Sequence, residues 1–160
     1  LAATVAGFEQ LIEQGQIRHW GASNFDVDDM DELMSVPGGS ACATNQVYYA
    51  LSERGPQFAL LPWQQRHSMP LMAYSPIDQG RLAGNRALQA VADRHGATPA
   101  RVALAWLLGQ TGVMAIPKAV REEHLRDNFA ASSLQLDDDD RRALDQAFPP
   151  PDEKTPLSMI

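Results

Sequence analysis

Cysteine and positive charge are both scarce in this chain of 160 residues. Its one cysteine, Cys42, has no partner for a disulfide within the chain, which favours a reducing compartment such as the cytoplasm. Thirteen basic against twenty acidic residues leave a net charge of −7, so a broad basic surface for nucleic acid is excluded. No apolar run approaches the roughly 20 residues that span a bilayer. No signal peptide is evident. We therefore expect neither a nucleic-acid nor a membrane partner.

Short apolar segments alternate with segments of helical periodicity along the whole chain. The β-branched, aromatic and apolar segments predict four strands, over residues 17–23, 43–49, 71–74 and 113–116. Helical spacing predicts helices over residues 5–12, 27–34, 57–67, 86–95, 99–110, 122–131 and 137–148. Pro62 is expected to break the third helix or delay its start. Residues 149–160 are expected to form an extended tail on the surface.

This alternation predicts an α/β protein with a parallel sheet and helical crossovers. No repeat or low-complexity linker divides the chain, so residues 1–160 are expected to form a single domain. No G-x-G-x-x-G follows any predicted strand, which argues against a Rossmann dinucleotide fold. The helical pattern already runs at Leu1, which suggests a piece of something longer.

Polar and aromatic residues follow the predicted strands, where ligands bind in parallel α/β folds. Asn24 and Gln46 could grip a carboxamide, Tyr74 could stack on a flat ring, and Lys118 could meet a phosphate. Each also has a plain structural interpretation. Asn24 suits a turn, Gln46 could satisfy neighbouring backbone, Tyr74 could be a packed strand aromatic, and Lys118 a solvated loop residue. The spacing alone does not name a ligand.

Four ordered motifs resemble the C-terminal part of an aldo-keto reductase. They are GQIRHWGASNF over 15–25, NQV over 45–47, MAYSP over 72–76 and IPKAVREEHLRDN over 116–128. The tail motif KTPL, residues 154–157, resembles bacterial members that reduce small aldehydes and keto-sugars. The resemblance implies a (β/α)8 TIM barrel, of which this chain is the second half: about four βα units with a C-terminal helix and tail.

The resemblance also implies that NADPH binds in extended form at the carboxyl ends of the strands. Ser23, Asn24 and Gln46 would then hydrogen-bond the nicotinamide carboxamide, and Tyr74 would stack on the nicotinamide. The loop that follows, by the same resemblance, would approach the pyrophosphate through Ser75, Ile77 and Gln79.

At the adenosine end, the resemblance pairs Lys118 with the 2′-phosphate. It also places Asp127 and Asn128 at the adenine. Two positions depart from the family pattern, because many members have Arg where this chain has His124 and Ser where it has Ala119. An imidazole clamps a phosphate more weakly than a bidentate guanidinium does, so NADH is a possible second cofactor. Arg121 is a candidate to compensate.

The catalytic Tyr, Asp, Lys and His of the family belong to the first half of its barrel, and no motif here matches them. We therefore assign no catalytic residue, and interpret Tyr48, Tyr49, His19 and His67 as packing or surface residues. The run Asp137–Asp140 is interpreted as a charged helix start rather than a metal site. His95 and His124 lack metal-ligand spacing, so no metal is expected.

The expected activity is that of an oxidoreductase: NADPH-dependent reduction of a small aldehyde or ketone to an alcohol in a full-length parent. This chain would supply most of the cofactor contacts and be inactive alone. The alternative is a non-catalytic cofactor-binding or regulatory module on the same scaffold. The expected partners are the carbonyl substrate and the missing N-terminal half of the barrel. A chain on its own would expose two strand edges and self-associate instead.

Overall fold

A computed structural model describes all 160 residues, and its centre is a four-stranded sheet. The strands are β1 (Trp20–Ser23), β2 (Cys42–Tyr48), β3 (Leu71–Tyr74) and β4 (Val113–Ala115). All pair in parallel, in the order β1-β2-β3-β4. The predicted parallel sheet is confirmed.

The first strand is shorter than the prediction of residues 17–23. It begins at Trp20 because the backbone N–H groups of Gln16 and Ile17 both donate to the carbonyl of Leu11, which draws those residues into the turn that closes the first helix. Gly15 occupies this turn with a φ of +69°, a conformation that glycine adopts without steric penalty.

Seven α-helices surround the sheet, and they match the seven predicted ones to within a few residues. They are α1 (Ala2–Glu13), α2 (Val27–Ser35), α3 (Leu60–Arg66), α4 (Arg86–Arg94), α5 (Pro99–Leu108), α6 (Glu122–Ala130) and α7 (Asp138–Ala147). Several of them begin at a side-chain cap, because an Asp, Asn or Thr oxygen accepts an otherwise unpaired N–H. Asp26, Asn85, Thr98 and Asp137 are these caps.

The helix expected over residues 57–67 starts late, as predicted from Pro62. It begins at Leu60, after a 3-10 turn at Gly55–Gln57, which puts Pro62 in the first helical turn where no N–H is needed. The loop expected after β3 contains a kinked 3-10 segment, Asp78–Gly84.

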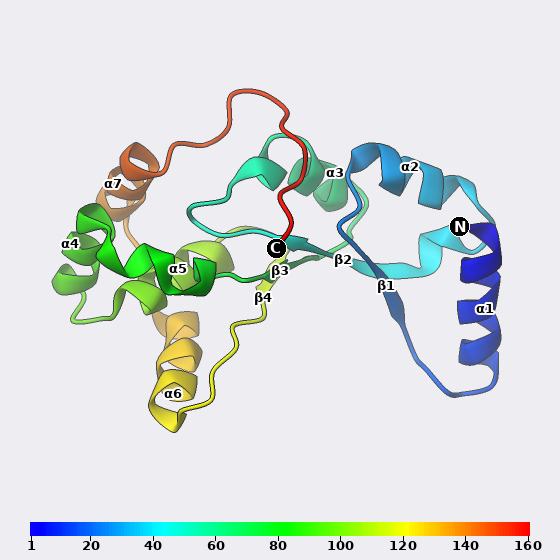
Figure 1. Ribbon diagram of the computed structural model, residues 1–160, viewed down its shortest axis with the longest axis horizontal. Coiled ribbons are helices and arrows are strands. Elements are labelled where there is room, and N and C mark those ends of the chain that lie inside the picture. The colour runs from blue at the N-terminus through cyan, green and yellow to red at the C-terminus, as the bar shows by residue number, and fades with distance from the viewer.

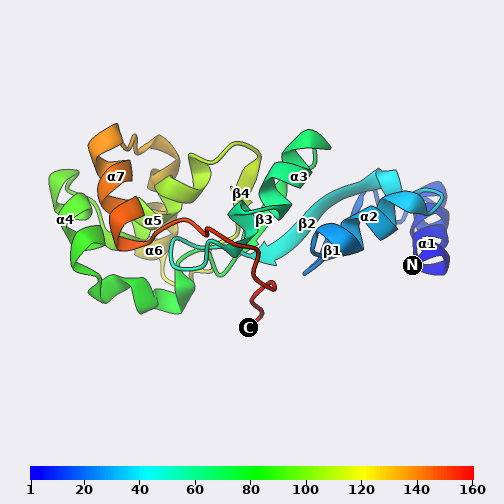
Figure 2. The same ribbon diagram turned by 90° about the horizontal axis from the view of Figure 1, so that it is seen from above.

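The core lies between the sheet and the helices, and α5 contributes most to it. Six successive residues of α5, Val102 to Leu107, are buried. The Trp106 ring meets Tyr49 edge-on and lies 4.8 Å from the Arg54 guanidinium. Figure 1 shows α4, α5 and α7 gathered beyond β4, and Figure 2 shows the chain elongated, with α1 and α2 at the opposite end. The sheet therefore stays open, with β1 and β4 as its edges.

The aspartate run at the start of α7 is more than a solvated helix end. Asp137 and Asp140 form the capping box, but the Asp140 side chain is fully buried. It pairs with Arg94, and its Oδ2 lies 2.6 Å from His95 Nε2. Asp140 thus joins α7 to the end of α4.

The C-terminal tail is extended, as predicted, and returns from α7 past α3 toward the sheet (Figure 1). Lys154 Nζ lies 3.1 Å from Asp26 Oδ2, and Ser158 Oγ donates to Glu53. Leu157 packs against the core. The tail is therefore held to the rest of the chain by an ion pair at Lys154, a hydrogen bond at Ser158 and apolar packing at Leu157. None of the helices combines the length and apolar character that crossing a membrane requires.

Candidate functional site

The carboxyl ends of the four strands meet along one edge of the sheet. Ser23 and Tyr74 end β1 and β3, Gln46 lies near the end of β2, and Lys118 follows β4 by three residues. Ser23 is in register with Gln46, and Tyr48 with Tyr74. Groups predicted from separate segments of the sequence therefore share the edge at which parallel α/β folds bind ligands.

Ser23, Asn24 and Gln46 form one hydrogen-bonded corner at the end of β1. The Gln46 carbonyl accepts from Ser23 Oγ at 3.1 Å and from the Asn24 backbone N–H at 2.9 Å. Asn24 has a φ of +58°, so its structural interpretation as a turn residue is correct. Its side-chain Oδ1 is also buried without a hydrogen-bond partner in the chain. Because a buried polar atom is normally paired, this oxygen is suited to accept from a ligand N–H.

Tyr74 lies beside a second tyrosine that the sequence analysis set aside. The rings of Tyr48 and Tyr74 are stacked, with centroids 5.7 Å apart and planes at 17°. The Tyr48 hydroxyl donates to Asp78 Oδ1 at 2.5 Å. Burial, together with the hydrogen bond to Asp78, raises the pKa of Tyr48 to about 12, so this hydroxyl keeps its proton at neutral pH. Tyr48 is thus packed, as expected, but it also connects Tyr74 to the following loop.

That loop holds an unusual number of left-handed residues. Ser75, Asp78 and Gln79 have φ values of +47°, +48° and +53°, and Gly80 follows at +86°. The left-handed region costs a residue other than glycine about 1–2 kcal/mol. Strain of this kind collects at ligand sites, where the surrounding structure maintains it.

The loop and the segment after β4 enclose a hollow of about 490 Å³. Its lining includes three of the residues predicted to approach a pyrophosphate, together with Lys118. The lining residues are Ser75, Pro76, Ile77, Gln79, Gly80, Ile116 and Lys118. A second hollow of about 200 Å³ shares Ile77 and Lys118 with the first. The two hollows are therefore neighbours, and together they are called the trough.

The second hollow collects the residues predicted for the adenosine end. It is lined by Ile77, Thr98, Ala100, Lys118, His124, Asp127 and Asn128. Arg121 lies beside it, with Nη2 2.7 Å from His124 Nε2. Arg121 and His124 also approach Glu123, at 3.2 Å and 3.6 Å. Lys118 forms no ion pair, so its ammonium is available to an anion in the trough.

Asp127 and Ala119, both predicted at the adenosine end, differ from the other residues predicted there. Asp127 already pairs with Arg101, whose Nε lies 2.8 Å from Oδ1, and accepts from Thr98, so its carboxylate joins α6 to the start of α5. Ala119 is next to Lys118 but lines neither hollow. Their contacts with a cofactor stay predictions.

The sequence did not predict that Thr98 and Ala100 line the second hollow, or that Tyr48 contacts Asp78. A Gly that follows Asp78 and Gln79 is typical of a tight turn, and this signal could have marked the loop as strained.

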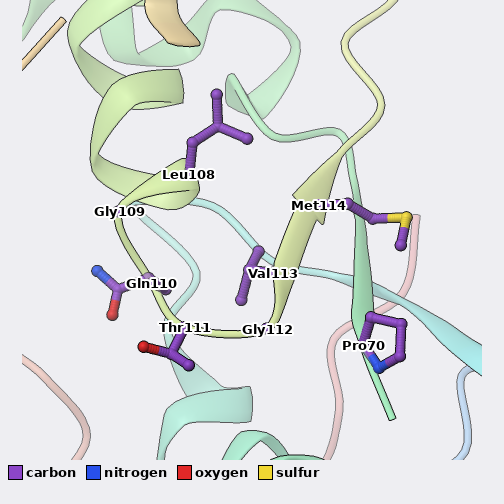
Figure 3. Close-up of a pocket in the computed structure, with 8 residues that line it drawn as sticks. All are labelled: Pro70, Leu108, Gly109, Gln110, Thr111, Gly112, Val113 and Met114. Atoms are coloured by element: carbon purple, nitrogen blue, oxygen red, sulfur yellow. The ribbon is translucent and has the colours of Figure 1, made fainter. Parts of the chain in front are cut away.

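Another hollow, of about 440 Å³, lies at the opposite end of β4 (Figure 3). It surrounds the turn between α5 and β4 and is lined by Pro70 and residues 108–114. None of these side chains ionises. This hollow therefore offers no group for acid–base chemistry or for pairing with a charged ligand.

The remaining tyrosine and histidines stand apart from the trough. Tyr49 is fully buried, its hydroxyl has no partner, and burial raises its pKa. His67 stacks on Trp63 at 3.8 Å, and its Nδ1 lies 2.8 Å from the Trp63 carbonyl. His19 is exposed before β1. No group of three His, Cys, Asp or Glu side chains is placed to hold a metal ion.

Comparison with known proteins decides the family. The sequence profile described as "Aldo/keto reductase family" matches residues 1–148. The chain belongs to the aldo/keto reductase family. It is 48% identical over 162 residues to methylglyoxal reductase YeaE of Escherichia coli (strain K12), an alignment that covers 98% of this chain and 57% of that protein. It is 32% identical over 132 residues to methylglyoxal reductase DkgB of Escherichia coli O157:H7, covering 82% of this chain and 48% of that protein.

Solved aldo-keto reductases have the same architecture. A crystal structure of an aldo-keto reductase from Klebsiella pneumoniae in complex with NADPH superposes with a TM-score of 0.97 at 43% identity, covering 99% of this chain and 58% of that one. A second structure from this organism, with NADP and acetate, gives a TM-score of 0.96 at 43% identity, covering 98% of this chain and 57% of that one. The chain thus spans a little over half the length of these relatives. Its four parallel βα units are part of an aldo-keto reductase TIM barrel, which confirms the predicted fold class.

Proposed function

We propose that this chain holds NADPH along the carboxyl edge of its sheet and serves the reduction of small aldehydes or ketones. The observation that carries the proposal is the alignment of one continuous set of groups. It runs from the unpartnered Asn24 Oδ1, past Tyr74 and the loop of residues 75–80, to the unpaired Lys118. An acceptor, an aromatic face, a polar hollow and a cation suit, in turn, a carboxamide, a nicotinamide ring, a pyrophosphate and a 2′-phosphate.

Each part of the chain has a separate task in this proposal. Asn24 Oδ1 accepts from the carboxamide, Ser23 and Gln46 support it, and Tyr74 presents its ring to the nicotinamide. When bound, NADPH supplies the hydride that reduces the carbonyl carbon. Ser75, Ile77 and Gln79 line the diphosphate-sized hollow, and Lys118 pairs with the 2′-phosphate.

The substrate class follows from the relatives. Two of them are named methylglyoxal reductases, so we propose a small aldehyde with an adjacent carbonyl as substrate. Tyr48 is bonded to Asp78, Tyr49 is enclosed, and His124 lines the hollow assigned to the adenosine end rather than the carboxamide corner. We therefore propose that the proton donor comes from outside this chain.

Lys118→Ala tests the cofactor assignment in the protein at its natural length. A charge-assisted contact is worth about 1.5–3 kcal/mol, so NADPH binding is expected to weaken about 10- to 150-fold. NADH has no 2′-phosphate, and its binding is expected to stay unchanged. Fluorescence titration of both cofactors measures this. Lys154→Ala is the control, because that lysine is already paired with Asp26 and lines neither hollow. Equal losses for NADPH and NADH would remove Lys118 from the phosphate.

Turnover separates the reductase from a cofactor-binding module without catalysis. The protein at its natural length is expected to oxidise NADPH with methylglyoxal, whereas a polypeptide limited to these 160 residues is expected to stay at background. A proton donor must lie within about 2.6–3.2 Å of the carbonyl oxygen. NADPH binding without turnover at natural length would favour the module. Turnover by the mass-verified 160-residue polypeptide would show that the donor lies within it.

A further inference from the structure

Asp78 is the most heavily bonded side chain of the loop after β3, although it was not assigned to the site. It is 8% exposed. Its Oδ1 accepts from Tyr48 Oη at 2.5 Å and lies 2.9 Å from Arg81 Nη2, and its Oδ2 accepts from Ser52 Oγ at 3.0 Å. Both carboxylate oxygens are thus engaged by the chain itself.

The backbone at this position explains why the carboxylate matters. Asp78 has a φ of +48°, and its N–H donates to the Ser75 carbonyl at 2.9 Å, which closes the turn. Glycine would adopt this conformation without steric penalty, whereas aspartate is strained in it. The three side-chain contacts are what hold the strained turn in place. They fix the loop that forms one wall of the trough.

One of these contacts reaches the aromatic pair. Tyr48 ends β2 opposite Tyr74, which ends β3, and the two rings are stacked. The hydrogen bond between Tyr48 and Asp78 therefore links the ring that stacks on Tyr74 to the loop that follows Tyr74 in the chain. A change at Asp78 therefore affects the turn of the loop and the contact with Tyr48 together.

We propose that Asp78 is a positioning residue, which holds the loop of residues 75–80 and the Tyr48–Tyr74 pair in one arrangement for the nicotinamide half of the cofactor. The inference rests on the proposed NADPH binding. Asp78 acts through Tyr48 and the loop and does not itself contact the cofactor. Asp78 itself contacts neither Lys118 nor His124, so the adenosine half is expected to depend on it less.

The test compares two ligands in the protein at its natural length. Asp78→Gly keeps the positive φ without strain and removes the carboxylate. It is expected to weaken NADPH binding about tenfold, equivalent to about 1.4 kcal/mol. Binding of 2′,5′-ADP, which lacks the nicotinamide half, is expected to weaken less, and the melting temperature to change little. Calorimetric titration measures both ligands.

Two more substitutions test the route through the loop. Tyr48→Phe keeps the stacked ring and removes only the hydroxyl, and it is expected to weaken NADPH binding in the same direction. Asp78→Asn still accepts from Tyr48 and tolerates the left-handed backbone, so it is expected to recover part of the affinity that Asp78→Gly loses. If Asp78→Gly does not fold, Tyr48→Phe decides the question.

Asp140→Asn is the control for a purely structural role. Asp140 is also a buried carboxylate paired with an arginine, but it joins α4 to α7 away from the trough. Its substitution is expected to lower the melting temperature and leave NADPH affinity unchanged. Unchanged NADPH affinity in Asp78→Gly would overturn the proposal. So would equal losses for NADPH and 2′,5′-ADP together with a lowered melting temperature. A wild-type protein that binds no NADPH would instead refute the proposed function itself.

Discussion

Helices α5 and α6 lie on either side of β4 in the chain, one entering the strand and the other leaving it, yet their surroundings differ. Six residues of α5 are buried, and none of α6 is. Leu104 on α5 is 1% exposed, whereas Leu125 and Phe129 on α6 are 51% and 80% exposed. The cause is their position, since α5 packs against α4, α6 and β4, while α6 contacts chiefly α5 and the 3-10 turn that follows it, Ala131–Ser133. Similar apolar side chains are therefore expected to contribute more to the free energy of unfolding on α5 than on α6.

Truncation of one leucine on each helix gives the largest expected contrast. Leu104→Ala is expected to lower the free energy of unfolding by about 2–5 kcal/mol, because it removes buried contacts and leaves a cavity. Leu125→Ala is expected to change it by no more than about 0.5 kcal/mol, as for most surface substitutions. Urea denaturation of both variants measures this difference. A loss at Leu125 as large as that at Leu104 would mean that α6 is covered in solution.

The second largest effect concerns the charge that anchors α7 to the end of α4. Burial by itself raises the pKa of the Asp140 carboxyl, but the hydrogen bonds from Arg94 and His95 outweigh it and lower the pKa to about 2. Because the folded-state pKa lies below the usual 3.8, this carboxylate stabilises the fold above about pH 4. That contribution is lost as the pH falls toward 2.

Asp140→Asn is therefore expected to lower the free energy of unfolding by about 1.5–3 kcal/mol at neutral pH. It is also expected to flatten the loss of stability between pH 4 and pH 2. Denaturation at a series of pH values measures both effects, with Asp139→Asn as the exposed control. A pH dependence as steep as that of the wild type would contradict the role of Asp140.

Local features of the fold could be predicted from the sequence, whereas contacts between distant residues could not. The four strands and their parallel pairing follow from local pattern, and so does the placing of Tyr74 and Lys118 at strand ends. The bond from Tyr48 to Asp78 spans 30 residues and depends on the kinked turn, which no periodicity reveals. The burial of Asp140 inside a run of four aspartates was equally hidden, since the run itself is typical of a solvated helix start.

A smaller effect is expected at the open edge. β1 and β4 each pair with only one neighbour, and Val120 and Phe129, in the part of the chain that follows β4, are exposed. A polypeptide limited to these 160 residues is therefore expected to self-associate through this edge. Phe129→Asp is expected to weaken the association about tenfold, the equivalent of about 1.4 kcal/mol. Sedimentation at several concentrations measures this, and a wild-type polypeptide that is monomeric throughout would contradict it.

The smallest expected effect is a difference between two arginines that form ion pairs with acidic residues of α6. Arg101 pairs with Asp127 across the junction of α5 and α6 and is partly buried, whereas Arg126 pairs with Glu122 on the exposed face of α6 itself. Arg101→Ala is expected to lower the free energy of unfolding by about 1 kcal/mol, because a charge-assisted bond between two helices is lost. Arg126→Ala is expected to lower it by less than about 0.5 kcal/mol, the usual value of an exposed i, i+4 pair. Urea denaturation in low and high salt measures both. Equal losses for the two variants would mean that α6 is not anchored to α5 through Asp127.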